Sequence, residues 1–487
     1  MSRRMLLALF CVLTLPVAAW AQTGALQAAL ATLGATALRS VQYTATGNAY
    51  VLGQPPSATE PWPIRPVKSY QIAVDYGTQS ARIEQVLTMP TPQPRGGGAP
   101  FVGEQRQIQL VRGAFAWNLP PTGQGDPVPQ QAAAWERLLW MWMATPHGLL
   151  KAAGNTSAKP VADGAELTFT VGGRYSLWVH INKQNHVDRA RAYLDNPVLG
   201  DMLVETTYSG YKDFGGLVFP SRITQSMGGH PTLELNITSV TANPFVDIAV
   251  PDNVRLAGSS LPPAAAKSEK VAEGIYWIIG GSHHSLAVDM GDHVVVIEAP
   301  QHEMRSEAVI AEVKKVIPNK PIRYVVNTHI HFDHSGGLRT YVDEGATVVT
   351  HQANVPFYQK AWANPRTIGI DRLAKSKKTP TFMGVGARAE LKGTNNRVIE
   401  LHTLAGNPHN EQTLVAWLPA ERILFQSDMM NPPAPGAQVP PPTPTITNFY
   451  ENLQRLKIQP EQIVGGHGAR IATAKDLTIV AGKGGTN

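Results

Sequence analysis

Three histidines and one aspartate lie within six residues of one another, at His329, His331, Asp333 and His334. They follow the apolar run 322–326, whose length and composition predict a buried strand. Histidines two apart at a strand end can face one metal ion, and the Asp-His pair beyond the bend can face a second. Imidazole and carboxylate are common nitrogen and oxygen ligands of zinc. With 15 histidines in 487 residues, this density argues against a chance polar turn and predicts a metal site.

Gly336 and Gly337 follow directly, and their missing side chains allow the backbone to turn closely beneath such a site. The spacing His-x-His-x-Asp-His resembles the signature of the metallo-β-lactamase superfamily. The resemblance covers about Val271 to Gly482. It implies an α/β fold, an αββα sandwich, in the C-terminal half of the chain and a metal-dependent hydrolase activity.

The resemblance extends to an acidic residue and a third histidine. Glu298 follows the strand-like run 294–297, where the superfamily usually has aspartate, and the resemblance implies that it braces the metal-binding loop from outside. His409 precedes the apolar run 414–418, as expected for a third ligand of the first ion. Its neighbours Pro408 and Asn410 depart from the glycine and threonine that are common there.

Two more motifs complete the pattern. Asp428 ends the run 422–428, and His467 stands in Gly466-His467-Gly468 after an apolar pair. The resemblance implies two zinc ions per chain. It assigns His329, His331 and His409 to one ion, Asp333, His334 and His467 to the other, and Asp428 to a bridge between them.

In such a centre two zinc ions share a water, lower its pKa toward about 7 and supply a hydroxide nucleophile. Asp333 is then expected to be catalytic, because it can orient this nucleophile or pass on its proton. The resemblance implies a small-molecule substrate with an ester, lactone, thioester, amide or phosphoester bond.

Other functions remain open at this point. A β-lactamase is one, although Asp428 stands where one lactamase class has cysteine and another has serine, and Asn431 stands where the cysteine class has a lysine. An iron-dependent, sulfur dioxygenase-like enzyme is another. The diiron flavoprotein branch has glutamate where this chain retains His331. A purely structural metal beside an apolar-ligand domain is a third, but seven ligands exceed the four of a closed structural zinc site.

The remaining histidines show no comparable spacing. His283 and His284 are expected in a loop near the site, where a substrate contact is a hypothesis. His351 and His402 are interpreted as structural. Four others belong to the N-terminal half, His147, His180, His186 and His230.

The N-terminus predicts export. Arg3 and Arg4 precede the apolar run 5–18 and the small-x-small site 19–21, which together form a signal peptide with cleavage after Ala21. We therefore expect a periplasmic or secreted protein with no membrane span after cleavage, the alternative being an uncleaved anchor. The only cysteine, Cys11, lies in this segment, so the mature chain must build any metal site from His, Asp or Glu.

Composition adds little about partners. The net charge of +6 is a weak bias toward anionic partners, and no nucleic-acid motif is recognisable. The densest basic stretch, Lys375 to Lys378, is interpreted as a solvated loop. Oligomeric state cannot be predicted.

The length suggests two or three domains. Residues 22–262 show alternating patterns, for example 175–181 and 233–237, that predict a mainly antiparallel β domain, with a helix over about 130–152. In pattern this part resembles the half-barrel of periplasmic lipoprotein carriers. A linker at 261–266 leads to the catalytic domain, 268–487. Substrate specificity is expected in two loops, 357–386 and 431–445.

Overall fold

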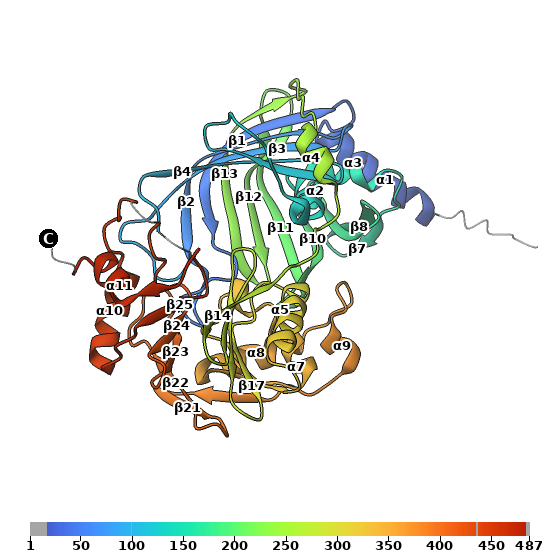
Figure 1. Ribbon diagram of the computed structural model, residues 1–487. Coiled ribbons are helices and arrows are strands. Elements are labelled where there is room, and N and C mark those ends of the chain that lie inside the picture. Colours follow the sequence, from blue (N-terminus) through green and yellow to red (C-terminus); the bar gives the residue numbers. More distant parts are fainter. Residues whose placement is uncertain (1–16, 99, 435–436, 484–487) are drawn as a thin grey trace, which may run out of the picture.

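The computed structural model describes residues 17–98, 100–434 and 437–483 (Figure 1). Helix α1 (Val17–Thr32) runs through the predicted cleavage site after Ala21. The rest of the predicted signal peptide, including Cys11, lies outside the described residues. Within those ranges no helix is both long and apolar enough to cross a bilayer.

The N-terminal half forms one antiparallel sheet of 13 strands. Strands adjacent in the sheet are also adjacent in the chain, except that β1 pairs with β13 and joins two meanders. Along the sheet the strands are β6 (Val128–Pro129), β5 (Phe115–Leu119), β4 (Glu104–Arg112), β3 (Ser80–Thr88), β2 (Ile64–Asp75), β1 (Ser40–Tyr50), β13 (His230–Ala242), β12 (Val218–Met227), β11 (Gly200–Asp213), β10 (Val187–Asn196), β9 (Tyr175–Asn182), β8 (Gly164–Val171) and β7 (Lys159–Val161).

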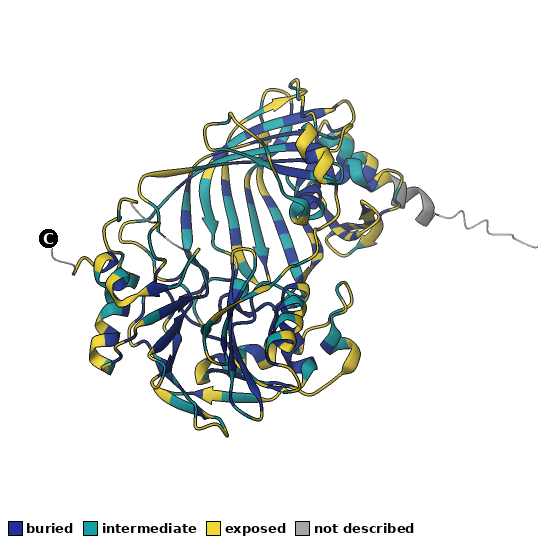
Figure 2. Cartoon of the chain, in the orientation of Figure 1, coloured by how far each residue is buried: buried dark blue, intermediate teal, exposed yellow. Residues whose placement is uncertain are grey.

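One face of this sheet is buried. In β9, Leu177, Val179 and Ile181 lie in the core and the alternating Ser176 and Trp178 are exposed, as the sequence predicts, whereas His180 in the same alternating set is buried. The buried face packs against the helices of this half, and Figure 2 shows buried and more exposed residues alternating along the long strands. The predicted antiparallel β domain is therefore confirmed.

The prediction of a single helix over 130–152 is wrong. The segment forms three short helices, η1 (Gln131–Ala133), α2 (Ala134–Met143) and α3 (Pro146–Ala153). The break falls at Thr145, which is extended and whose hydroxyl accepts a hydrogen bond from the Gly148 amide. A residue before proline avoids the helical conformation, and threonine is a good N-cap, so Thr145-Pro146 starts a new helix. A fourth short helix, α4 (Asp252–Ala257), follows the sheet.

The C-terminal half contains two sheets. The first runs in order from β14 (Lys267–Ala272) through β15 (Ile275–Ile279), β16 (Ser285–Asp289), β17 (Val294–Ile297), β18 (Ile322–Val326) and β19 (Thr347–His351) to β20 (Phe382–Val385). The second runs from β21 (Arg388–Lys392) through β22 (Val398–Thr403), β23 (Leu414–Leu418), β24 (Ile423–Gln426) and β25 (Gln462–Gly465) to β26 (Ala472–Thr473). Parallel pairing begins at β17–β18 in the first sheet and is confined to β24–β25 in the second.

Three apolar cores define the layers of this half. The central core joins the facing sides of the two sheets, with Val295 and Ile297 from the first and Leu414 and Phe425 from the second. The first sheet's outer face packs against α5 (Glu303–Val316), α7 (Leu338–Glu344), α8 (Val355–Trp362) and α9 (Arg372–Ser376). The second sheet's outer face packs against α10 (Pro444–Leu456) and α11 (Ala474–Val480). The αββα sandwich is thus confirmed (Figure 1).

The prediction of a loop over 357–386 is wrong, because this segment contains most of α8, all of α9 and β20. Tyr358 is fully buried in the core of the first sheet, and Trp362 and Phe382 pack against that core. Lys375 likewise lies in α9. These three aromatic residues fix α8 and β20 against the core of the sheet.

The two halves of the chain pack directly against each other. The segment 51–63 between β1 and β2 reaches the C-terminal half, where the Phe332 amide donates to the Gly53 carbonyl over 3.1 Å and the Glu411 amide donates to the Pro56 carbonyl over 2.9 Å. Beside this contact lies a cavity of about 1300 Å³, with walls from both halves that include Trp62, Trp178, Tyr193, Phe332 and Phe357.

Candidate metal centre

Strand β18 positions the first four predicted ligands. His329 and His331 follow its carboxyl end, and Asp333 and His334 lie in the one-turn helix α6 (Phe332–Ser335). Gly336 then passes so close to the loop after β17 that a Cβ atom there would lie 1.9 Å from the Gln301 carbonyl oxygen. A side chain is therefore excluded at this turn beneath the site.

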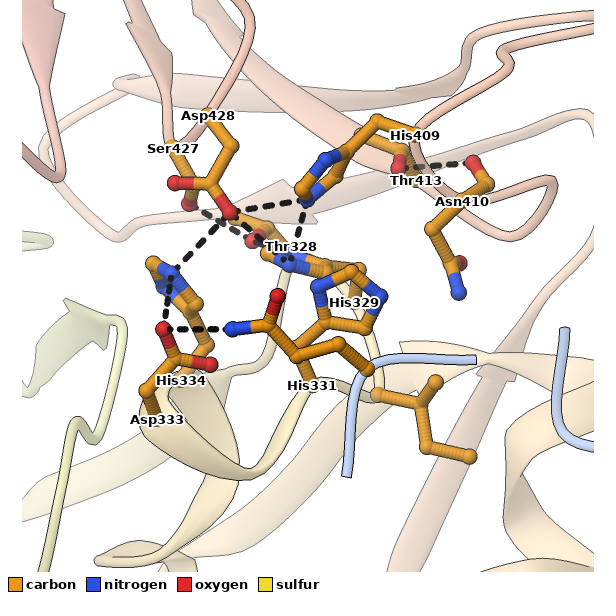
Figure 3. A network of polar contacts seen from close by, with 12 residues as sticks. Thr328, His329, His331, Asp333, His334, His409, Asn410, Thr413, Ser427 and Asp428 are labelled. Atoms are coloured by element: carbon orange, nitrogen blue, oxygen red, sulfur yellow. Dashed lines mark hydrogen bonds and ion pairs between the residues drawn. The ribbon is translucent and has the colours of Figure 1, made fainter. Parts of the chain in front are cut away.

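The second sheet positions the other three predicted ligands. His409 precedes β23, Asp428 follows β24 and His467 follows β25. The site thus lies where the ends of strands from both sheets meet, and Figure 3 shows His329, His334, His409 and Asp428 pointing toward one another.

The first cluster holds four potential ligands, His329, His331, His409 and Asp428, each offering one atom within 4.8 Å of the others. Nε2 of His409 lies 2.8 Å from Oδ2 of Asp428 and 3.3 Å from Nε2 of His329. Nε2 of His329 lies 3.2 Å from the same carboxylate oxygen. Two imidazole nitrogens and a carboxylate oxygen converging in this way can share one cation.

The hydrogen bonds of His331 indicate which of its ring nitrogens can bind a metal ion. Its Nε2 donates to the Pro55 carbonyl over 2.9 Å, which leaves Nδ1 without a proton in the neutral ring. Nδ1 is buried and has no hydrogen-bond partner among the described residues. A buried lone pair without a donor is costly, and a metal ion would satisfy it.

A second cluster lies beside the first and consists of His283, His334 and His467. Nε2 of His467 is 3.2 Å from Nε2 of His334 and 2.8 Å from Oδ1 of Asp428. Nε2 of His334 is 3.1 Å from Oδ2 of Asp428. The Asp428 carboxylate therefore lies between the two clusters and contacts histidines of both.

Asp333 lies at the edge of the second cluster rather than inside it. Its Oδ2 is 3.3 Å from Nε2 of His283, 3.8 Å from Nε2 of His334 and 3.4 Å from the side-chain amide of Gln54. Its Oδ1 is buried and has no hydrogen-bond partner among the described residues. The sequence assigned Asp333 to the second ion, whereas the structure places His283 among the closest histidines of that cluster.

Glu298 lies behind the second cluster. It is fully buried, one carboxylate oxygen contacts Nδ1 of His334, and the other accepts the Thr328 amide over 2.8 Å. Its backbone is left-handed, with φ of 76°, which turns the chain toward the site at the end of β17. Glu298 thereby holds the ring of His334 with Nε2 facing inward.

The electrostatics of the site favour positive charge. Burial opposes ionisation, but the carboxylates of Asp428 and Glu298 outweigh it and raise the pKa of His334 well above its usual value. Burial lowers the pKa of His331 well below its usual value, which keeps that ring neutral and able to coordinate. Two buried carboxylates lie around one imidazole, and a bound metal ion would balance their negative charge.

Sequence reasoning missed Gln54 and Pro55, since nothing in the segment 51–63 distinguishes it from an ordinary proline-rich loop. It also gave His283 only a possible substrate contact. His284 does not face the site, because its Nε2 contacts the Gly468 carbonyl at 2.9 Å. His147 and His180, expected to have no ligand role, contact a backbone carbonyl and two aspartates of the N-terminal half, respectively.

Comparison with known proteins gives matches to the C-terminal half of the chain. The family model described as the metallo-beta-lactamase superfamily matches residues 276–467. No curated protein gives a significant match. Solved structures similar to the chain include a metallo-beta-lactamase from Pontibacter korlensis, with 17% identity over 45% of this chain and 98% of that one and a TM-score of 0.35.

The DIM-1 metallo-beta-lactamase is 18% identical over 45% of this chain and 96% of its own, with a TM-score of 0.34. A metallo-beta-lactamase from Hirschia baltica is 19% identical over 45% of this chain and 97% of its own, with a TM-score of 0.33. The match to the metallo-beta-lactamase superfamily thus spans residues 276–467, the part of the chain that carries both histidine clusters, and the members of this superfamily are metal-dependent hydrolases.

Proposed function

We propose that the chain is an exported dinuclear zinc hydrolase that cleaves an ester, lactone, thioester, amide or phosphoester bond of a small molecule. The observation that carries this proposal is the position of Asp428. Its carboxylate contacts His329 and His409 on one side and His334 and His467 on the other. A carboxylate shared by two histidine clusters suits two neighbouring cations.

The donors also suit zinc. They are imidazole nitrogens and carboxylate oxygens only, and in this chain no cysteine beyond Cys11 could contribute. His329, His331 and His409 would hold one ion, and His334, His467 and Asp333 the other, with Asp428 between them. Two zinc ions bound there would activate a shared water as nucleophile and polarise the bond to be cleaved.

The protein's own groups would position and move the proton. Asp333 keeps Oδ1 free of hydrogen bonds from the described residues, and 34% of its side chain is exposed. Burial opposes ionisation, but the hydrogen bond from His283 and the charge of His334 lower the pKa of Asp333 below its usual value. Asp333 is therefore a carboxylate at neutral pH that can accept a proton at Oδ1 and return it to the leaving group.

Export is part of the proposal and rests on the N-terminal sequence alone. Arg3, Arg4, the apolar run 5–18 and the small-x-small site ending at Ala21 favour a cleaved signal peptide and a periplasmic or secreted enzyme. N-terminal sequencing of the protein recovered from the periplasm tests it. A mature chain that begins at Gln22 is expected, and a cytoplasmic chain with an intact N-terminus would contradict export.

A hydrolysis panel tests the activity. We expect the zinc-loaded protein to cleave one of an aryl ester, a lactone, a thioester or a phosphodiester, and Asp333→Asn to reduce its kcat by at least about 100-fold. Preferential cleavage of a chromogenic cephalosporin would instead favour a β-lactamase. A panel in which no substrate is cleaved by the fully zinc-loaded protein would contradict the hydrolase proposal.

A further inference from the structure

His283 stands out because the superfamily resemblance assigns it no role, and yet its ring enters the second histidine cluster. It lies in the loop between β15 and β16, and only 8% of the residue is exposed. Its ring centroid is 4.2 Å from that of His467 and 5.1 Å from that of His334. Each of these three rings offers a nitrogen within 4.8 Å of the others.

The orientation of the ring selects Nε2 as the inward atom. Nδ1 of His283 lies 2.8 Å from the hydroxyl of Ser282, and Nε2 lies 3.3 Å from Oδ2 of Asp333. Nε2 donates to this carboxylate only in the tautomer that carries its proton. In the other tautomer Nδ1 donates to the Ser282 hydroxyl, and the lone pair of Nε2 faces the site, where it can bind an ion in place of the contact with Asp333.

The loop that carries His283 is fixed to the loop that carries His467. The His284 amide donates to the Gly466 carbonyl over 2.8 Å, and His284 Nε2 contacts the Gly468 carbonyl. Nδ1 of His467 donates to the Ser282 carbonyl over 2.7 Å. The two rings are therefore held as one unit.

A buried arginine fixes the same loop from behind. The Arg305 guanidinium donates to the His283 carbonyl over 3.0 Å and to the Ile278 carbonyl over 3.4 Å. A surface loop that only touches substrate does not need this many backbone restraints. Restraint of this kind is what a metal ligand needs, since its donor atom must be held in place before the ion arrives.

We propose that His283 is a metal ligand and supplies a third imidazole, beside His334 and His467, at the second metal position. This inference rests on the proposed dinuclear centre and deepens it. The second position then offers three imidazoles and one oxygen of Asp428, while the side-chain amide of Gln54 donates to Oδ2 of Asp333 and holds that carboxylate at its edge. Asp333 is thereby freed from an obligatory ligand role to carry a proton.

Metal binding to full-length His283→Phe tests the inference without measuring activity. Phenylalanine keeps the ring and removes both nitrogens. We expect wild-type protein to bind two zinc ions, and the variant to bind one tightly and the second at least about 100-fold more weakly, as measured by competition with a chromophoric chelator. His186→Ala, which removes an imidazole that stacks on Tyr211 in the N-terminal half, is the matched control and should bind both ions normally.

His283→Asp separates loss of a ligand from loss of structure. Aspartate can coordinate zinc, so this variant should recover most of the second affinity, while His283→Phe should not. The zinc-dependent rise in melting temperature should follow the same order. If His283→Phe binds each of the two ions as tightly as the wild-type protein does, this inference alone is overturned. A wild-type protein that binds fewer than two ions would overturn the dinuclear proposal and this inference with it.

Discussion

Three of the candidate ligand histidines are oriented by a hydrogen bond at the outer ring nitrogen. His331 donates to the Pro55 carbonyl, His467 to the Ser282 carbonyl, and His334 contacts the Glu298 carboxylate. In a neutral imidazole a proton on one nitrogen leaves the lone pair on the other. The partners outside the cluster thus decide which atom of each of these three rings faces inward.

A histidine far from the site gives a pH prediction. His147 is fully buried between α3 and the sheet, stacks on Phe219, and contacts the Leu33 carbonyl through Nε2. Burial lowers its pKa from 6.5 to about 4. Between these values the unfolded chain binds more protons than the folded one, so the stability contributed by neutral His147 is lost as the pH falls.

We expect this one group to reduce the free energy of unfolding by about 2 kcal/mol between pH 7 and pH 5. His147→Gln removes the titration, so its stability should fall less with pH than that of the wild type. Urea unfolding of both proteins in chelator at the two pH values measures the difference. Parallel pH dependences would show that His147 is not held neutral.

At the scale of elements, the metal loop depends on close contact between backbones. A Cβ on Gly336 would approach the Gln301 carbonyl oxygen to 1.9 Å, and neither backbone can move without shifting the end of β17 or the helix α6. We expect Gly336→Ala to lose high-affinity binding of both ions and to destabilise the protein by about 3 kcal/mol. Zinc titration and thermal melting measure these effects.

Gly24→Ala is the control, since a Cβ at Gly24 would meet nothing within 4 Å. A Gly336→Ala variant that binds zinc with wild-type affinity would mean that the loop is more tolerant than its packing implies.

The elements themselves were largely predictable. The short apolar runs at β17, β18 and β23 have the bounds that the sequence predicts, because buried strands between turns leave a clear pattern. The break at Thr145 and the buried role of Tyr358 were not predicted. The first depends on a cap and a proline that compete with a long helical pattern, and the second on which side of α8 meets the sheet.

The candidate site, like the elements, was predictable from the sequence only in part. The motif and the superfamily order predicted most of the side chains that the structure brings together from β18 onward, because these residues lie close to strand ends. Pro55 and Gln54 could not be predicted, since their role depends on how the N-terminal sheet packs on the C-terminal half. The part played by His283 likewise depends on a loop held by Arg305 and Gly466, a tertiary contact that leaves no local pattern.

At the scale of the whole molecule, a buried arginine connects the two halves. Arg366 follows α8 and donates to the carbonyls of Asn196, Pro197 and Val198 in the turn between β10 and β11. The adjacent Asp201 amide donates to the Pro365 carbonyl over 2.8 Å. The segment 51–63 makes a second contact, and the Gly96 amide, which donates to the Pro408 carbonyl over 2.9 Å, makes a third, so the N-terminal half is held beside the candidate metal centre at several places.

We expect Arg366→Ala to weaken this attachment, because three buried carbonyls lose a charged donor, at a cost of about 3 kcal/mol. In calorimetry the variant should unfold in two separated transitions, the lower from the N-terminal half. Arg189→Ala, in the N-terminal strand β10, is the control. A single transition at the wild-type temperature would show that Arg366 does not couple the halves.

The central claim is that two zinc ions bind on either side of Asp428. Elemental analysis of purified wild-type protein and Asp428→Ala, after exhaustive dialysis, tests it most directly. We expect about two zinc per chain in the wild type and at most one in Asp428→Ala, because this carboxylate contacts both clusters. Stoichiometric iron in the wild type, or two zinc ions retained by Asp428→Ala, would contradict it.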